Sequence, residues 1–230
     1  MRIVFVFLIA SSLLFSCNSS DKSPDVSGIK VELSSRRFEQ DLFKLDTANF
    51  TTNFDQLLAK YPSFGENYLS AILNADPKWS ADSAADYVTG FITAYKPVYD
   101  SAQKVFKDFD KYEKEIKQAL QFVKHYFPAY KDRKQIITYI GPLDGYGDIL
   151  SDDAIIIGLQ HHLGKSFSLY RSALVQETYP EYISNRFEPD YIPVNCMQNI
   201  MNDLYPEKID DKPLVQQMVE KGKRLYALSR

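Results

Sequence analysis

Carboxylates and glycines are concentrated in one short segment, and this combination of side chains can bind calcium. Residues 144–148 read Asp-Gly-Tyr-Gly-Asp, and Asp152 follows soon after. The spacing departs from an EF-hand loop, because Tyr146 occupies the third ligand position and Ile149 replaces the turn glycine. A plain turn, in which Gly and Asp tolerate positive φ, is therefore the favoured interpretation. The carboxylates kept as weak calcium candidates are Asp144, Asp148 and Asp152.

The histidines are the next candidates for metal binding or proton transfer. His161 and His162 are adjacent, and His125 is distant from them in the sequence. Neighbouring residues of a helix point about 100° apart, so this pair cannot form the same-face zinc site of a His-Glu-x-x-His helix. That motif does not occur in the sequence. We expect partly buried, structural histidines.

Nucleophilic catalysis receives no support from the sequence. Neither a Gly-x-Ser-x-Gly motif nor a cysteine-protease signature occurs. Cys196 is predicted to be a small buried hydrophobic residue rather than a reactive thiol. We therefore predict a protein that is not an enzyme and has no cofactor.

The amino-terminal residues carry a lipoprotein signal. Arg2 supplies a positive charge, the apolar run 3–14 is too short to span a bilayer, and the chain turns polar directly after Cys17. The predicted leader is residues 1–16, and Cys17 is the predicted lipid attachment site, whose acyl chains hold the protein at a membrane. An ordinary secretory signal with a chance cysteine is the weaker alternative. Asn18 favours the outer membrane over the inner membrane, so we expect a lipid-anchored envelope protein that faces an extracytoplasmic compartment.

Composition limits the partners and the number of domains. The net charge of the chain is −3, with basic and acidic residues interspersed, so we predict no nucleic-acid partner. Residues 17–28 are polar and predict a flexible tether. Residues 29–230 predict a single globular domain.

Strand patterns occur in three places. Residues 29–33 alternate between apolar and charged side chains, and residues 136–140 and 154–158 are β-branched or apolar runs. The last two runs predict a hairpin with a long loop. Together the three strands predict a small sheet covered by helices on one side.

Helical periodicity fills most of the remaining chain. Ser80, with Ser83 three places later, is predicted to cap a helix that Pro97 ends or kinks. The fold class is therefore α+β, predominantly helical, with about three strands. The predicted helical segments are residues 50–61, 64–73, 80–97, 106–127, 190–205 and 212–228.

Several segments together resemble the GldB family of gliding-motility lipoproteins from Bacteroidetes-type bacteria. The match begins with the lipobox at Cys17 and continues with Arg-Phe-Glu-Gln-Asp-Leu-Phe at residues 37–43. No single motif is specific, but their order and spacing cover most of the chain. The remaining similar segments are residues 61–64, 125–128, 157–159, 163–165 and 182–189.

The resemblance implies a membrane-anchored envelope lipoprotein that acts through contacts with other envelope or motility proteins. It also implies a distant similarity to zincin-like zinc proteases, so the alternative is a divergent or inactive metallopeptidase-like hydrolase. Residues 195–199, in the helix after Pro189, hold no zinc ligands, and hydrolytic activity is not carried over. Family members usually continue further, so the resemblance implies a domain shortened at its carboxyl end.

Overall fold

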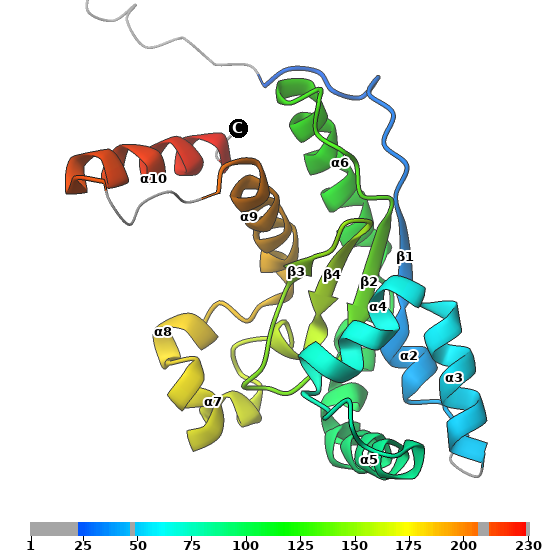
Figure 1. The fold of residues 1–230 in the computed structure, drawn as a ribbon. Coiled ribbons are helices and arrows are strands. Elements are labelled where there is room, and N and C mark those ends of the chain that lie inside the picture. The colour runs from blue at the N-terminus through cyan, green and yellow to red at the C-terminus, as the bar shows by residue number, and fades with distance from the viewer. Residues whose placement is uncertain (1–22, 47–48, 207–211, 229–230) are drawn as a thin grey trace, which may run out of the picture.

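A four-stranded mixed sheet forms the centre of the computed structural model, which describes residues 23–46, 49–206 and 212–228 (Figure 1). In this described part, β1, β2 and β4 are parallel, whereas β3 is antiparallel to β4. The predicted class, α+β and predominantly helical, is confirmed, with four strands in place of about three. In their order across the sheet, the strands are β1 (Ser34–Arg37), β2 (Gln135–Tyr139), β4 (Ala154–Gly158) and β3 (Ile149–Leu150).

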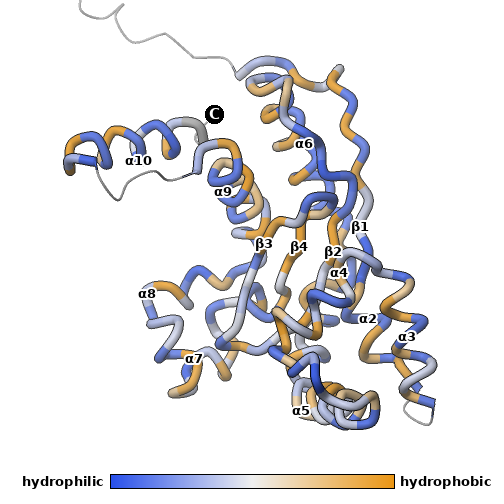
Figure 2. Tube along the Cα trace, viewed as in Figure 1, coloured by the Kyte–Doolittle hydropathy of each residue, from blue (hydrophilic) through white to orange (hydrophobic). Residues whose placement is uncertain are grey.

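Both faces of the two central strands are buried. Successive side chains of a strand point to opposite faces, and every residue of β4 and all but Gln135 in β2 are buried. Figure 2 shows hydrophobic residues concentrated in these strands. The prediction that helices cover the sheet on one side is therefore wrong, because parallel strands of this apolar composition are covered on both faces.

The connection between the central strands differs from the expected hairpin. β2 and β4 run parallel, with Ile136 opposite Ile155. The chain returns between them through β3, so the hairpin is formed by β3 and β4 instead. Its turn is closed where the amide of Ser151 donates to the carbonyl of Ala154 at 2.9 Å.

The first strand begins later than the alternation predicts. Residues 29–33 lie outside the sheet, and the ladder starts where Ser34 lies opposite Gln135. The segment instead runs along a helix, since the carbonyl of Ile29 accepts a 2.8 Å hydrogen bond from Gln121. Val26, within the predicted tether, is already buried.

The predicted helices are confirmed, with shifted ends. Ser80 caps its helix by accepting from the amide of Ser83. The α-helices are α2 (Phe38–Leu42), α3 (Phe50–Lys60), α4 (Pro62–Asn67), α5 (Ala81–Val105), α6 (Asp110–Tyr126), α7 (Ala173–Thr178), α8 (Glu181–Ser184), α9 (Ile192–Leu204) and α10 (Leu214–Leu228). A π-helical turn, η3 (Tyr68–Ile72), extends α4, and short 3₁₀ turns are η4 (Leu159–His161), η5 (Ser168–Arg171) and η6 (Pro189–Tyr191).

Pro97 does not end its helix, because α5 continues to Val105. A proline inside a helix leaves the carbonyl four residues earlier without its amide donor. Here Pro97 and Thr93 are both exposed, so water can bond to that carbonyl. The buried side chains of Val98 and Ala102 hold the following turns against the core.

Within the described residues, no helix has both the length and the apolar character needed to cross a bilayer.

Candidate functional site

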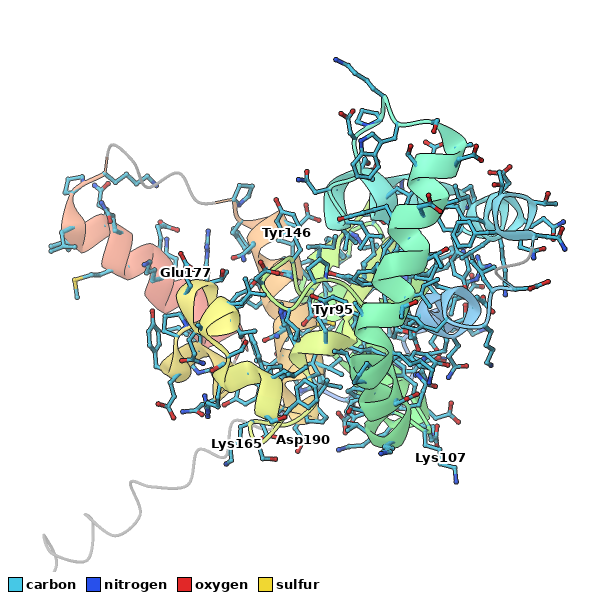
Figure 3. All side chains as sticks on the ribbon, turned by 90° about the horizontal axis from the view of Figure 1, so that it is seen from below. Tyr95, Lys107, Tyr146, Lys165, Glu177 and Asp190 are labelled. Atoms are coloured by element: carbon cyan, nitrogen blue, oxygen red, sulfur yellow. The ribbon has the colours of Figure 1, made fainter. Side chains whose placement is uncertain are left out.

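The carboxyl ends of β2 and β4 bring the predicted site residues to one edge of the sheet. Because these strands are parallel, the loop after β2 and the turn after β4 lie at the same end. The first loop contains Asp148, and the second segment contains His161 and His162. Figure 3 looks onto this end of the molecule and shows Tyr146, also of the first loop.

Asp148 is the centre of a buried hydrogen-bond network. Its Oδ2 lies 2.9 Å from His162 Nε2 and accepts a 3.0 Å bond from Asn195 Nδ2. Its Oδ1 accepts from the amide of Gly158 at 3.1 Å, and its carbonyl accepts from Asn199 at 2.8 Å. Three segments, the end of β4, the turn with His162 and helix α9, therefore meet at Asp148, and we call this group the Asp148 cluster.

His162 stands between two acceptors. Its Nε2 faces the carboxylate of Asp148, and its Nδ1 lies 3.3 Å from the carbonyl of Glu188. The ring of His162 therefore bridges the carboxylate of Asp148 and the backbone of Glu188.

His161 is held as a neutral ring beside this pair. It stacks on Phe187 with 4.5 Å between ring centroids and donates from Nε2 to the carbonyl of Leu143 at 2.9 Å. Its Nδ1 lies so near Gly147 that a Cβ there would approach to 2.9 Å. A glycine is therefore required at position 147 for the ring to occupy this place.

The pKa values follow from burial and from these partners. Burial alone would raise the pKa of Asp148, but the charge and hydrogen bond of His162 and the hydrogen bond of Asn195 outweigh it and lower that pKa. Burial lowers the pKa of His161 to about 4, and the positive charge of His162 acts in the same direction. Burial also raises the pKa of the Cys196 thiol well above its usual value, as expected for an inert, fully buried cysteine.

We expect His161 to make stability depend on pH between about 6.5 and 4. The folded protein holds the pKa of His161 at about 4, whereas the unfolded chain has the ordinary value near 6.5, so protonation favours unfolding as the pH falls. The stabilising contribution is complete above about pH 6.5 and is lost on approaching pH 4, a change of about 3 kcal/mol. Urea unfolding at a series of pH values should therefore show a smaller acid loss in His161→Phe than in the wild type.

The missing hydrogen bond to Leu143 lowers the stability of His161→Phe at every pH, so it does not affect the comparison of slopes. His125→Phe is the matched control, because the ring of His125 is exposed in the folded protein. It should retain the wild-type profile. Parallel profiles for His161→Phe and the wild type would show that His161 does not titrate in this way.

The Asp148 cluster is closed to solvent. The side chains of Asp148 and His162 are 3 % and 1 % exposed. The two adjacent histidines were expected to be partly buried, and both are almost fully buried and hydrogen-bonded. The pair joins the loop after β2 to the turn after β4 at this edge of the sheet.

The three calcium candidates are not gathered into one site. Asp148 is occupied by the cluster, whereas Asp152 is exposed in the turn between β3 and β4. Asp144 lies in the loop after β2. Among the described residues, no group of three or more His, Cys, Asp or Glu side chains is arranged to hold a metal ion.

The other predicted site residue, Cys17, and the leader 1–16 lie outside the described residues. A comparison with protein-family models finds a match over residues 19–230 to the family described as gliding motility protein GldB. This chain belongs to the GldB family. No curated protein and no solved structure matches it.

The first GldB-like segment, residues 37–43, has a structural role. Phe38, Glu39 and Leu42 are fully buried. Glu39 joins two elements, because it accepts 2.6 Å hydrogen bonds from Arg37 in β1 and from Thr138 in β2. The buried residues of this segment therefore attach α2 to the sheet.

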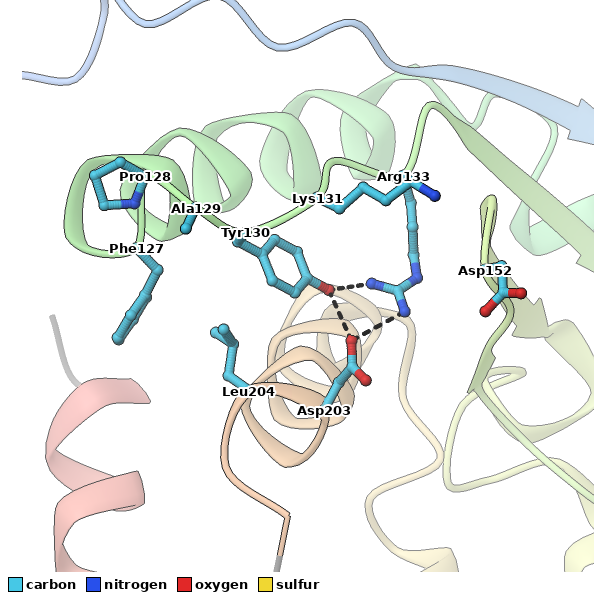
Figure 4. A pocket seen from close by; sticks show the side chains of 9 residues that line it. All are labelled: Phe127, Pro128, Ala129, Tyr130, Lys131, Arg133, Asp152, Asp203 and Leu204. Atoms are coloured by element: carbon cyan, nitrogen blue, oxygen red, sulfur yellow. Dashed lines mark hydrogen bonds and ion pairs between the residues drawn. The ribbon is translucent and has the colours of Figure 1, made fainter.

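Another GldB-like segment, residues 125–128, leads to a cleft at the opposite edge of the sheet (Figure 4). The cleft has a volume of about 510 Å³. Arg133 crosses its wall, donating to the carbonyl of Ser151 at 2.6 Å and to Asp203 at 3.0 Å. Burial raises the pKa of Tyr130, which also bonds to Arg133, to about 12. The cleft is lined by Phe127, Pro128, Ala129, Tyr130, Lys131, Arg133, Asp152, Asp203 and Leu204.

The GldB chain thus has site residues that its motifs do not reveal. Asn195 and Asn199 lie in the helix segment that was considered above only because it lacks zinc ligands. Both side chains donate hydrogen bonds to Asp148. Their spacing of four places them on one helix face, which is the signal that could have indicated a shared partner. Arg133 and Asp203 are far apart in the sequence and carry no comparable signal.

Proposed function

We propose that this GldB-family chain is an envelope lipoprotein, anchored through acyl chains on Cys17, that acts by binding other envelope or motility proteins. The observation that carries the proposal is the family match over residues 19–230, which begins directly after the predicted lipobox. Asn18 supports the outer membrane as the site of the anchor.

A binding role is supported over catalysis by the state of the acid–base residues. The Asp148 and His162 side chains are sealed, and Cys196 is fully buried. A hydrolase needs such groups within hydrogen-bond reach of its substrate. These buried groups instead hold together the loops at the carboxyl ends of β2 and β4.

The segment from η5 to α8 is the partner surface that we propose. It exposes Leu169, Leu174 and Tyr182, the last with 75 % of its surface accessible. Exposed aromatic and aliphatic side chains are typical of the central contacts in protein interfaces. Two hydrogen bonds attach the segment to the rest of the protein. Tyr170 donates to the carbonyl of Gln160 at 2.7 Å, and Tyr179 donates to the carbonyl of Gly145 at 2.5 Å.

Site-specific crosslinking in living cells tests this surface. A photoreactive phenylalanine analogue at position 182 should form a discrete, ultraviolet-dependent product with an envelope protein. The matched control is position 126. Tyr126 is also an exposed tyrosine, but it is the last residue of α6 and lies beside the amino edge of the sheet. Position 126 should not form that product.

Mass spectrometry of the protein purified from membranes tests the anchor separately. The amino-terminal peptide should begin at Cys17 and carry a thioether-linked diacylglycerol. An unmodified Cys17 would refute the anchor, and equal crosslinking at positions 182 and 126 would refute the partner surface. Stoichiometric zinc in the purified protein would refute the non-enzymatic role and favour the hydrolase.

A further inference from the structure

Helix α10 is turned with its apolar side outward. Leu214, Val215, Met218, Val219 and Leu225 are 51–70 % exposed. At 3.6 residues per turn these five positions fall within an arc of roughly 140° on one side of the helix. An apolar face of this kind, left open to water, marks a surface that another apolar phase covers.

The polar side of α10 faces the rest of the protein. Arg224 donates to Asn202 Oδ1 at 3.2 Å and to the carbonyl of Tyr205, which follows α9. Together with Glu220 and Lys223, Arg224 lines a cavity of about 400 Å³ whose other walls are Phe127, Met201 and Tyr205. The orientation is therefore fixed by polar contacts and is the reverse of a helix that completes the core.

Charges on α10 match an anionic surface. Lys221 and Lys223 lie at the two borders of the apolar arc, one on each side, and Lys223 also pairs with Glu220 of the polar side at 3.1 Å. Lysines in these positions can extend to lipid headgroups while the apolar side chains enter the acyl boundary. From Lys212 to Leu228 the helix and its first flanking residues carry Lys212, Lys221, Lys223 and Arg224 against Glu220 alone.

The position of α10 agrees with the proposed anchor. The carbonyl of Ile29 is bonded to Gln121 in the last part of α6, and Phe127, just after α6, lines the cavity under α10. Residues 23–30 and α10 therefore meet the same end of α6, and both lie at the upper end of Figure 1. The six Cα–Cα steps from Cys17 to Ser23 can span at most roughly 20 Å, so a lipid on Cys17 keeps this end close to the bilayer.

We propose that α10 lies in the interface of the membrane that carries the anchor, with its apolar face among the acyl chains and its lysines at anionic headgroups. This inference rests on the proposed anchor at Cys17. Two attachments would fix the orientation of the domain, since a single flexible tether leaves it free to rotate. The α7 and α8 surface would then face away from the bilayer, toward partners.

Tryptophan fluorescence of the full chain purified from membranes tests the proposal. The only native tryptophan is removed by Trp79→Phe, and Leu225→Trp then reports from the apolar face. The protein is reconstituted into vesicles of phosphatidylethanolamine and phosphatidylglycerol. We expect a blue shift of the emission and quenching by lipids brominated on their acyl chains. Gln216→Trp, an exposed position on the other side of α10, is the matched control and should show neither effect.

The outcomes separate α10 from the anchor. Mass spectrometry of the same preparation reports whether Cys17 carries its lipid, so an acylated protein without bromolipid quenching at position 225 overturns the α10 proposal and leaves the anchor intact. A blue shift already present in detergent without bromolipid quenching would indicate a protein partner or a second copy on this face, and it also overturns the proposal. Met218→Asp with Leu225→Asp should abolish penetration, detected by loss of quenching at a Val215→Trp reporter.

Discussion

Asp148→Ala is expected to lower the free energy of unfolding by about 3–5 kcal/mol, the usual cost of breaking a buried hydrogen-bonded pair that contains a charged group. The substitution leaves the ring of His162, the amide of Asn195 and the backbone N–H of Gly158 without their acceptor in a region closed to water. Each buried donor left unpaired costs more than its hydrogen bond contributes. Urea unfolding of the chain from Ser23 onward, at neutral pH, measures the loss.

Two further variants separate the charge from other effects. Asp148→Asn preserves the volume but turns an amide toward the donors of His162 and Asn195, so it should also destabilise strongly. Asp152→Ala is the matched control, since this exposed aspartate should change stability by no more than about 0.5 kcal/mol. A change that small for Asp148→Ala would show that the cluster does not hold the carboxyl edge together.

The same pair predicts the direction of acid sensitivity. The pKa of Asp148 is lowered in the folded protein, so its stabilising contribution is present above the ordinary carboxyl pKa and is lost as the pH falls through the lower, folded value. Asp148 therefore weakens the fold at more acidic pH than His161, whose window begins near pH 6.5 and ends at about 4.

Helices could be predicted from the sequence because their signal is local. The periodicity of residues 50–61 and the Ser80 cap reappear in α3 and α5. The strands were located from β-branched composition, but their pairing depends on contacts between distant segments. Ile155–Ile157 pair in parallel with residues that precede them by nineteen positions, and the short β3 that permits this has no composition signal.

The candidate site could be predicted only in part for a related reason. Acidic residues and histidines were candidates because their side chains can bind metals or transfer protons. Two of these candidates, Asp148 and His162, are in contact in the structure. The alternation of residues 29–33 placed the first strand too early, because Val31 is buried although it lies outside the sheet. Amides such as Asn195 have no distinctive chemistry in a sequence, so their role appears only when the fold brings them to a carboxylate.

The inverted α10 illustrates how one pattern can have two meanings. The stripe of residues 212–228 predicts an amphipathic helix, and α10 confirms it. The pattern gives the helix its two faces but does not say which one meets the protein. The contacts of Arg224 decide this, and they turn the apolar side outward.

Phe38→Ala is the second substitution for which we expect a large loss, about 3–5 kcal/mol. Phe38 is fully buried where β1 leads into α2, and its ring lies 5.1, 4.9 and 4.6 Å from the centroids of Tyr61, Phe64 and Tyr68. These rings come from the junction of α3 with α4, from α4 and from η3, so the cavity cannot collapse without moving α4 against the sheet. Edge-to-face contacts with Tyr61 and Phe64 add to the loss.

Urea unfolding with matched variants separates this packing effect from a general effect of losing an aromatic ring. Phe38→Leu retains most of the volume and should lose about 1–2 kcal/mol, as shape changes in a core do. Tyr182→Ala also removes a ring, but from an exposed position, and should be nearly neutral for stability. Similar losses for Phe38→Ala and Tyr182→Ala would contradict a packing role. In that case the GldB-like segment 37–43 would have to be explained by something other than the core.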